Sequence, residues 1–226
     1  PEARSEALSG WPGGGWPLIS GWRRRAALAQ MAHGFCETEA IAQGLTAAGM
    51  PRRLITVSGP LAEPSAALPC LEAERAALAA TLAGRPAWLA LGLPASEESA
   101  VIAAHDMAQR FAHRLLLIIT PAAPETGPAL AARLAGQGWS VALRSAEEEP
   151  EPATQIYIAD TEGEEGLWLR LAPVTWLGGT LAPHAPGQDP FAAAALGSAL
   201  VHGPGGSAHR ARMARLVAAG AARRVS

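Results

Sequence analysis

The chain has 226 residues, which corresponds to about one and a half average domains, and 49% of its residues are hydrophobic while 17% are charged. This composition excludes a largely disordered chain, because it supplies ample apolar material for a buried core. The formal net charge of -2 excludes a general nucleic-acid-binding protein, which needs a broad positive surface. Two cysteines are too few for a disulfide scaffold or a cysteine-rich zinc site, and they fit a reducing cytoplasm.

The N-terminal part of the sequence is irregular. Residues 1–25 place Trp11, Trp16 and Trp22 among Gly and Pro residues without a helical or strand period. A loop packed on a neighbouring core is the favoured interpretation, and a domain junction or a membrane interface remains open. Residues 26–49 show a helical pattern broken near Gly34.

From about residue 50 onward, short apolar runs alternate with segments of helical length. This alternation predicts βαβ units, and near-continuous apolar strands indicate a parallel sheet covered by helices on both faces. We therefore expect one doubly wound parallel sheet from about residue 50 to the end. The predicted strands are Leu54–Ser58, Ala87–Leu91, Leu115–Thr120, Ser140–Leu143, Gln155–Ala159, Val174–Leu177 and Ala199–His202.

Ligands of such sheets bind beyond the carboxyl ends of the strands, so the loops at these ends are the candidate sites. Gly178-Gly179-Thr180 follows one predicted strand, and the pair of glycines suits either a tight turn or an approach to an anion. Asp160–Glu165 follows another. Asp160 or Thr161 is expected to cap the next helix, although the carboxylates also suit the hydroxyls of a sugar or ribose.

A third loop leads into an Ala-rich helix, where Asp189-Pro190 reads as an N-cap followed by proline at the first helical position.

The scattered histidines form no metal-binding spacing, so no metal site is expected. Nucleophile and phosphate-binding motifs are absent. The most apolar stretch, Leu115–Thr120 followed by Pro121, Ala122 and Ala123, is far shorter than the roughly 18 residues that span a bilayer. No signal peptide opens the sequence.

Three consecutive segments carry a family resemblance: Asp160–Glu164, Leu167–Val174 and Gly178–Leu181. They resemble the signature of the 3-deoxy-D-manno-octulosonic acid (Kdo) transferases, which reads Asp-Thr-x-Gly-Glu-Leu, then an aromatic-containing helix, then Phe-x-Gly-Gly-Ser-Leu. Collinear matches flank this signature and extend the resemblance over most of residues 35–226. They are Val57–Gly59, Glu97-Glu98 with Ala103–His105, Pro121 with Pro124-Glu125, Asp189-Pro190 with Ala194–Gly197, and His202–Pro204 with Leu216–Val225.

The resemblance implies the C-terminal, donor-binding half of a two-domain (GT-B) glycosyltransferase. Such an enzyme transfers Kdo from cytidine monophosphate-Kdo (CMP-Kdo) to a lipid A precursor during lipopolysaccharide biosynthesis. Residues 1–50 would then be the interdomain segment and tail of the missing N-terminal half, and 51–226 the Rossmann-like donor domain. The implied location is cytoplasmic, with peripheral attachment to the inner membrane face left open.

The resemblance also implies the partners and the site. The implied donor is CMP-Kdo or another nucleotide sugar, and the lipid A precursor is expected to bind through the missing half. No cofactor, metal, nucleic acid or transmembrane segment is expected. No catalytic residue lies in this chain. The implied substrate-binding residues are Gly59, Pro121, Asp160, Thr161, Gly163, Glu164, Gly178, Gly179, Thr180, Gln188 and Asp189.

The sequence departs from the family pattern in the donor loops. Ala122 and Thr126 stand where the family has arginines, and Asp189 and Ala192 stand where it has Asn and Glu. Weak or lost donor binding is therefore expected, and enzyme activity is left open, with the chain alone expected to be inactive. The main alternative is a non-catalytic paralogue that acts as a binding or interaction module. A sugar epimerase, using Glu164 with His184, is the remaining alternative.

Overall fold

A computed structural model describes residues 28, 30–58, 67–181, 188–205 and 209–225 of the chain. The chain forms two compact units, Pro1–Glu63 and Pro64–Ser226. The tryptophan-rich segment 1–25 of the sequence analysis, Gly59 and His184 lie outside the described residues.

The described part of the first unit is a small βαβ arrangement. Strand β1 (Gly34–Cys36) pairs in parallel with β2 (Ile55–Val57), and helix α2 (Glu39–Ala47) connects them. Thr38 caps α2 by accepting a hydrogen bond from the backbone N–H of Ile41 at 3.3 Å. The break that the sequence predicts near Gly34 is strand β1, and helix α2 follows it. The prediction that Leu54–Ser58 belongs to the main sheet is wrong, because β2 pairs with β1 in a separate sheet.

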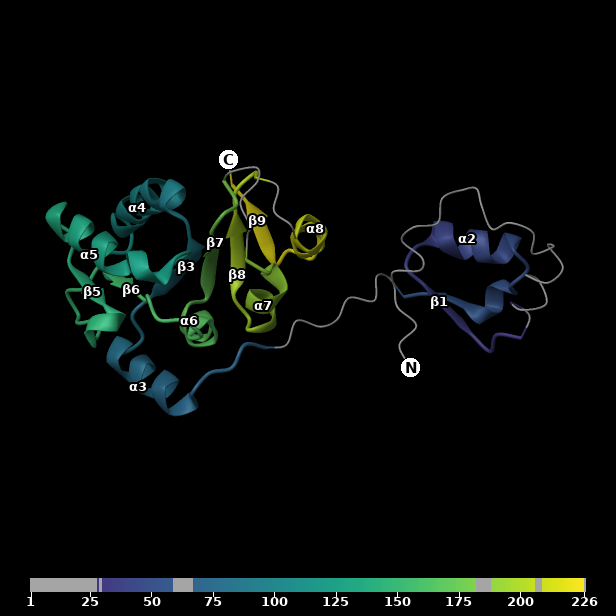
Figure 1. Cartoon of the computed structure of the whole chain (residues 1–226), viewed down its shortest axis with the longest axis horizontal. Coiled ribbons are helices and arrows are strands. Elements are labelled where there is room, and N and C mark those ends of the chain that lie inside the picture. Colours follow the sequence, from purple (N-terminus) through teal and green to yellow (C-terminus); the bar gives the residue numbers. More distant parts are fainter. Residues whose placement is uncertain (1–27, 29, 59–66, 182–187, 206–208, 226) are drawn as a thin grey trace. The chain divides into compact units, whose positions relative to one another are not determined.

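The second unit is a parallel sheet with helices on both faces (Figure 1), as the sequence predicts. The strands lie in the order β5-β6-β4-β3-β7-β8-β9, and every neighbouring pair is parallel. The strands are β3 (Ala87–Leu93), β4 (Leu116–Pro121), β5 (Val141–Leu143), β6 (Ile156–Ile158), β7 (Val174–Leu177), β8 (Ala199–His202) and β9 (Ala222–Arg224). The helices are α3 (Glu72–Leu82), α4 (Ala95–Gln109), α5 (Gly127–Gly136), α6 (Glu165–Leu171), α7 (Pro190–Ala195) and α8 (Arg210–Ala218).

Alternating side chains of the central strands fill a separate core on each face of the sheet. Leu116 and Ile118 of β4 pack with α3, α6, α7 and α8, whereas Leu117 and Ile119 pack with α4 and α5. All four side chains are at most 1% exposed. This two-sided burial explains why the strand reads as a continuous apolar run in the sequence.

The order of the strands fixes where a ligand can bind. The chain enters the sheet at β3, moves outward through β4 to the edge strand β5, and returns to β6 between β4 and β5. It then crosses to β7 on the other side of β3. The carboxyl ends of β3 and β7 are therefore the point at which the winding direction reverses. In open α/β sheets this switch point is where ligands bind.

At the switch point, β7 lies against β3 so closely that a side chain does not fit between them. The N–H of Gly178 donates to the carbonyl of Leu91 at 2.9 Å, and a Cβ added to Gly178 would lie 2.2 Å from the Gly92 carbonyl oxygen. Only glycine satisfies this contact, because the obstacle is backbone and cannot rotate away.

We expect Gly178→Ala to lower the free energy of unfolding by about 2 to 3 kcal/mol, because the added methyl group collides with the β3 backbone. Gly136→Ala is the matched control. A Cβ at Gly136 meets nothing within 4 Å, so this change should stabilise helix α5 by about 0.5 to 1 kcal/mol. Urea unfolding of both variants measures the difference, and equal effects would contradict the proposed close contact.

One buried histidine makes the larger unit sensitive to acid. His105 of α4 is fully buried, its Nδ1 accepts from Trp88 Nε1 at 3.1 Å, and its Nε2 lies 3.1 Å from the carbonyl oxygen of Gln155. Burial lowers the pKa of His105 to about 4. The neutral ring is therefore part of the native core.

Because the folded-state pKa of His105 lies below its unfolded value, stability from this site is complete at neutral pH and is lost as the pH falls below about 6.5. We expect the free energy of unfolding to drop by about 2 kcal/mol between pH 7 and pH 5 through this group. His105→Gln should flatten this part of the pH profile, and exposed His113→Gln should leave it unchanged. An unaltered profile in His105→Gln would refute the assignment.

Candidate functional site

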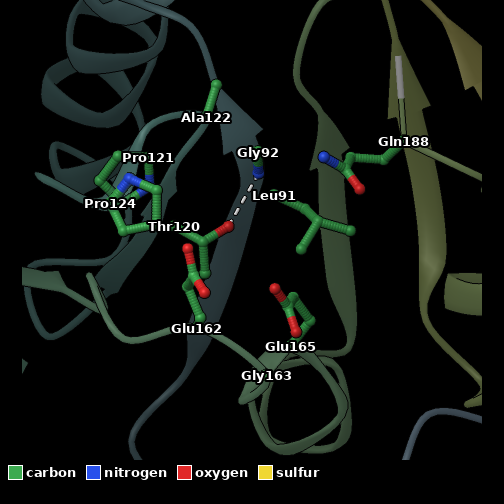
Figure 2. Close-up of a pocket in the computed structure, with 10 residues that line it drawn as sticks. All are labelled: Leu91, Gly92, Thr120, Pro121, Ala122, Pro124, Glu162, Gly163, Glu165 and Gln188. Carbon is green, nitrogen blue, oxygen red and sulfur yellow. Dashed lines mark hydrogen bonds between the residues drawn. The ribbon is translucent and has the colours of Figure 1, made fainter. Parts of the chain in front are cut away.

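A pocket opens at the carboxyl end of the sheet, beside the switch point (Figure 2). Its volume is about 400 Å³, and its walls come from the ends of β3 and β4, the segment that leads into α6, and the segment before α7. The residues that line it are Leu91, Gly92, Thr120, Pro121, Ala122, Pro124, Glu162, Gly163, Glu165 and Gln188.

The end of β3 shapes the pocket because Gly92 adopts a left-handed backbone conformation with φ of 61°. Its N–H donates to Thr120 Oγ1 at 2.8 Å, which joins β3 to β4. A Cβ on Gly92 would lie 2.3 Å from Nε2 of Gln188. The Gln188 side chain therefore lies directly over the end of β3, and any other residue at position 92 would displace it.

Three of the residues that the sequence assigns to substrate binding line this pocket. Pro121 ends β4, Gly163 precedes α6 with φ of 79°, and Gln188 precedes α7. The structure brings these three together from segments far apart in the sequence. Gly59 lies outside the described residues, and the remaining assigned residues do not line the pocket.

Asp160 holds the sheet together rather than capping a helix. Its Oδ1 accepts from the Ser145 backbone N–H at 2.9 Å and its Oδ2 from the Ser145 hydroxyl at 2.7 Å, so that the carboxylate ties β6 to the turn after β5. Helix α6 begins at Glu165 and has no side-chain cap hydrogen bond. The prediction that Asp160 or Thr161 caps this helix is wrong.

Glu164 and Thr161 belong to a charged network centred on Arg144. The Arg144 guanidinium bonds Glu164 at 2.8 Å and also bonds Glu74 of α3, and the Thr161 hydroxyl donates to Glu164. Burial alone would raise the pKa of Glu164, but the hydrogen bonds from Arg144 and Thr161 outweigh burial and hold the pKa below its ordinary value. The charged Glu164 carboxylate thus stabilises the fold through its contacts with Arg144 and Thr161.

The Gly178-Gly179-Thr180 loop behaves as a tight turn. Gly179 has φ of 74°, and the Thr180 hydroxyl donates to the Leu177 carbonyl at 2.6 Å while accepting from the Gly203 N–H at 2.9 Å. These bonds connect the ends of β7 and β8. Of the two functions considered for the glycine pair, the structure accounts for the turn.

Asp189 caps helix α7, as predicted. Its Oδ1 accepts from the Phe191 N–H at 3.0 Å, Pro190 occupies the first helical position, and Arg212 of α8 forms an ion pair with its Oδ2. The carboxylate therefore links the starts of α7 and α8.

Two residues that support the site were not predicted as site residues from the sequence. Glu97 of α4 is 1% exposed and accepts hydrogen bonds from Trp176 Nε1 at 3.2 Å and from the Leu181 N–H at 2.7 Å, so it holds β7 and the segment after it. Thr120 supports Gly92 as described above. Glu97 follows β3 and Thr120 lies near the end of β4, and polar residues at strand ends are candidates for a site. Their hydrogen-bond partners could not be predicted, because the partners are distant in the sequence.

The pocket is acidic. Glu162 and Glu165 line it, and no arginine or histidine is among its lining residues. Arg170 of α6 is held by backbone groups, since its Nη1 donates to the carbonyls of Leu68 and Gly166 at 2.8 and 2.7 Å. Among the described residues, no group of three or more metal-ligating side chains gathers, and each helix is too short or too polar to cross a membrane.

We expect Arg144→Met to lower the free energy of unfolding by about 1 to 2 kcal/mol, because it leaves two carboxylates without their shared cation. Arg133→Met is the control. Arg133 is 46% exposed in its pair with Glu98, so its loss should cost at most about 0.5 kcal/mol. Urea denaturation at neutral pH compares the two, and equal losses would contradict a special role for Arg144.

Two known proteins are similar in sequence to part of this chain. A probable mitochondrial 3-deoxy-D-manno-octulosonic acid transferase of Arabidopsis thaliana is 36% identical over 123 residues, which are 54% of this chain and 28% of that protein. A 3-deoxy-D-manno-octulosonic acid transferase of Haemophilus influenzae is 28% identical over 107 residues, 47% of this chain and 25% of that protein. The matches thus span about a quarter of the length of these relatives. No family model matches the chain.

A solved structure shares the fold of the chain. The C-terminal CMP-Kdo binding domain of WaaA from Acinetobacter baumannii superimposes with a TM-score of 0.62 at 22% identity, over 69% of this chain and 83% of that domain. The two sequence relatives confirm the resemblance to the Kdo transferases, and the solved structure confirms the fold. The chain is related in sequence to the Kdo transferases, and its larger unit has the Rossmann-like α/β fold of a C-terminal domain of the GT-B type.

Proposed function

We propose that the chain is the nucleotide-sugar-binding half of a Kdo-transferase-type glycosyltransferase, with the pocket of Figure 2 as its donor site. The observation that carries this proposal is the position of the pocket. It lies at the switch point of a sheet whose structural relative is a CMP-Kdo binding domain.

The assigned residues divide into two groups under this proposal. Pro121, Gly163 and Gln188 contact the donor. The others shape the loops around it, namely Asp160, Thr161, Glu164, Gly178, Gly179, Thr180 and Asp189. The donor is CMP-Kdo or another nucleotide sugar.

The acceptor is a lipid A precursor, held by a preceding half that supplies the catalytic base. In this proposal residues 1–50 are the tail of that half, and the enzyme works at the cytoplasmic face of the inner membrane. This chain alone transfers no sugar, because a glycosyl transfer needs both substrates in one cleft.

A non-catalytic binding module is the second candidate, and the charges in the pocket favour it. Ala122 lines the pocket where the Kdo-transferase pattern has an arginine, and Ala192 of α7 replaces a glutamate. An alanine cannot provide the charge-assisted hydrogen bonds that arginine gives to a phosphate.

We expect weak binding of CMP to the 226-residue chain. Loss of a hydrogen bond to a charged group costs about 1.5 to 3 kcal/mol, so two losses raise the Kd by about two to four powers of ten. Calorimetric titration with CMP measures the Kd. The double change Ala122→Arg with Ala192→Glu should restore affinity, whereas Ala103→Arg on the exposed side of α4 should not.

The outcomes separate the candidates. A gain of CMP affinity confined to the double variant supports a diverged donor site. Micromolar binding by the unmodified chain would overturn the expected loss of donor contacts. Absence of binding in every variant would overturn the donor-site proposal and favour the module.

A further inference from the structure

The charges of the chain are distributed unevenly along the sequence. Residues 190–226 contain five arginines and no aspartate or glutamate, whereas residues 1–189 contain 13 arginines and 20 acidic residues. The side chains of the last 37 residues therefore carry a formal net charge of +5, although the whole chain carries -2. Such a charge asymmetry is typical of a surface that contacts an anionic partner.

This positively charged segment forms one edge of the larger sheet. Strand β9 is the last strand of the sheet, and helix α8 lies beside it (Figure 1). Adjacent residues of a strand point to opposite faces, so Arg223 and Arg224 flank the outer edge of β9 on its two sides. Arg210 and Val217 are seven residues apart in α8 and lie on the same side of that helix.

The exposed residues of this edge are arginines and small apolar residues. Eleven residues between positions 210 and 225 are exposed, of which four are arginine and the other seven are alanine, glycine or valine. Val217 is 43% exposed and Val225 is 38% exposed. The exposed face of a surface helix ordinarily carries polar and acidic residues as well. We call Arg210, Val217, Arg223, Arg224 and Val225 the basic edge.

The cations of the basic edge are not neutralised by the described part of the chain. The neighbouring Arg212 pairs with Asp189, but among the described residues Arg210, Arg223 and Arg224 form no ion pair or hydrogen bond through their side chains. Their guanidinium groups are thus available to a partner. A guanidinium group matches the oxygens of a phosphate and can donate two hydrogen bonds to it.

An anionic lipid surface fits this combination of side chains. Arginines are attracted to anionic headgroups, while exposed apolar side chains enter the boundary between headgroups and acyl chains. Single-stranded nucleic acids are bound through aromatic side chains that stack on the bases, and residues 210–225 contain no aromatic residue. A second copy of the same edge would bring arginines against arginines, which repel each other.

We propose that the basic edge docks the larger unit on a bilayer that contains anionic phospholipid. The contact is peripheral. The arginines bind headgroup phosphates, and Val217 and Val225 lie in the interface. This inference goes beyond the proposed function, because the basic edge shares no residue with the donor pocket and its binding does not require CMP.

Co-sedimentation of the 226-residue chain with vesicles tests the proposal. One set of vesicles contains phosphatidylcholine alone, and the other contains equal parts of phosphatidylcholine and the anionic phosphatidylglycerol. We expect binding to the anionic vesicles only, and weaker binding at about 0.5 M salt because ions screen the attraction. Each arginine near an anionic surface strengthens binding about fivefold. The triple change Arg210→Gln, Arg223→Gln and Arg224→Gln should therefore weaken binding about a hundredfold.

Matched variants separate the basic edge from the net charge of the chain. The triple change Arg52→Gln, Arg110→Gln and Arg133→Gln removes the same charge from exposed ion pairs elsewhere, and it should weaken binding less than about threefold. Val217→Glu should weaken binding at least about tenfold, because it places an anion in the interface. Val174→Glu, at a similarly exposed position at the start of β7, should not. Circular dichroism verifies that each variant is folded.

The alternative results overturn the inference. Equal binding to the neutral vesicles would exclude recognition of anionic headgroups, and equal losses in the two arginine triples would trace the effect to net charge. Absence of vesicle binding would refute the proposal, and so would salt-sensitive binding to single-stranded RNA in its place. None of these results bears on the donor site, which the titration with CMP tests separately.

Discussion

The close approach of β7 to β3 is the constraint on which the rest of the larger unit depends. Gly178 places its backbone against the carbonyl of Gly92, and no side chain fits between them. Glu97 secures the same junction by bonding Trp176 and the backbone after β7. The ends of β3 and β4, the segment that leads into α6 and the segment before α7 form the walls of the cavity beside this junction.

Most polar residues that the sequence analysis assigned to substrate binding stabilise the fold around this junction. Asp160 connects β6 to Ser145, Glu164 completes the Arg144 network, and Asp189 caps α7. A carboxylate at a strand end satisfies backbone N–H groups that would otherwise be unpaired, so the same residue type serves structure and ligand binding alike.

The main sheet could be predicted because short apolar runs alternate with segments of helical length and because its central strand is continuously apolar. Leu116–Ile119 is buried on both faces, and that burial is visible as an unbroken apolar run. The small sheet could not be predicted, because β1 (Gly34–Cys36) lies within a segment of helical pattern and its partner β2 resembles the strands of the larger sheet. The family resemblance identified Pro121, Gly163 and Gln188 as pocket residues. The position of Gln188 over Gly92 could not be predicted, because it depends on a contact between segments far apart in the sequence.

The central claim is that the cavity beside Gly92 is where this chain binds a nucleoside-containing ligand. Amide NMR spectra recorded during titration with cytidine and with CMP locate the contact directly. The account predicts that the largest shifts occur at the amides of Gly92, Gly163 and Gln188, at the carboxyl end of the sheet. Shifts concentrated around Arg85 and Thr154, before the amino ends of β3 and β6, would contradict it.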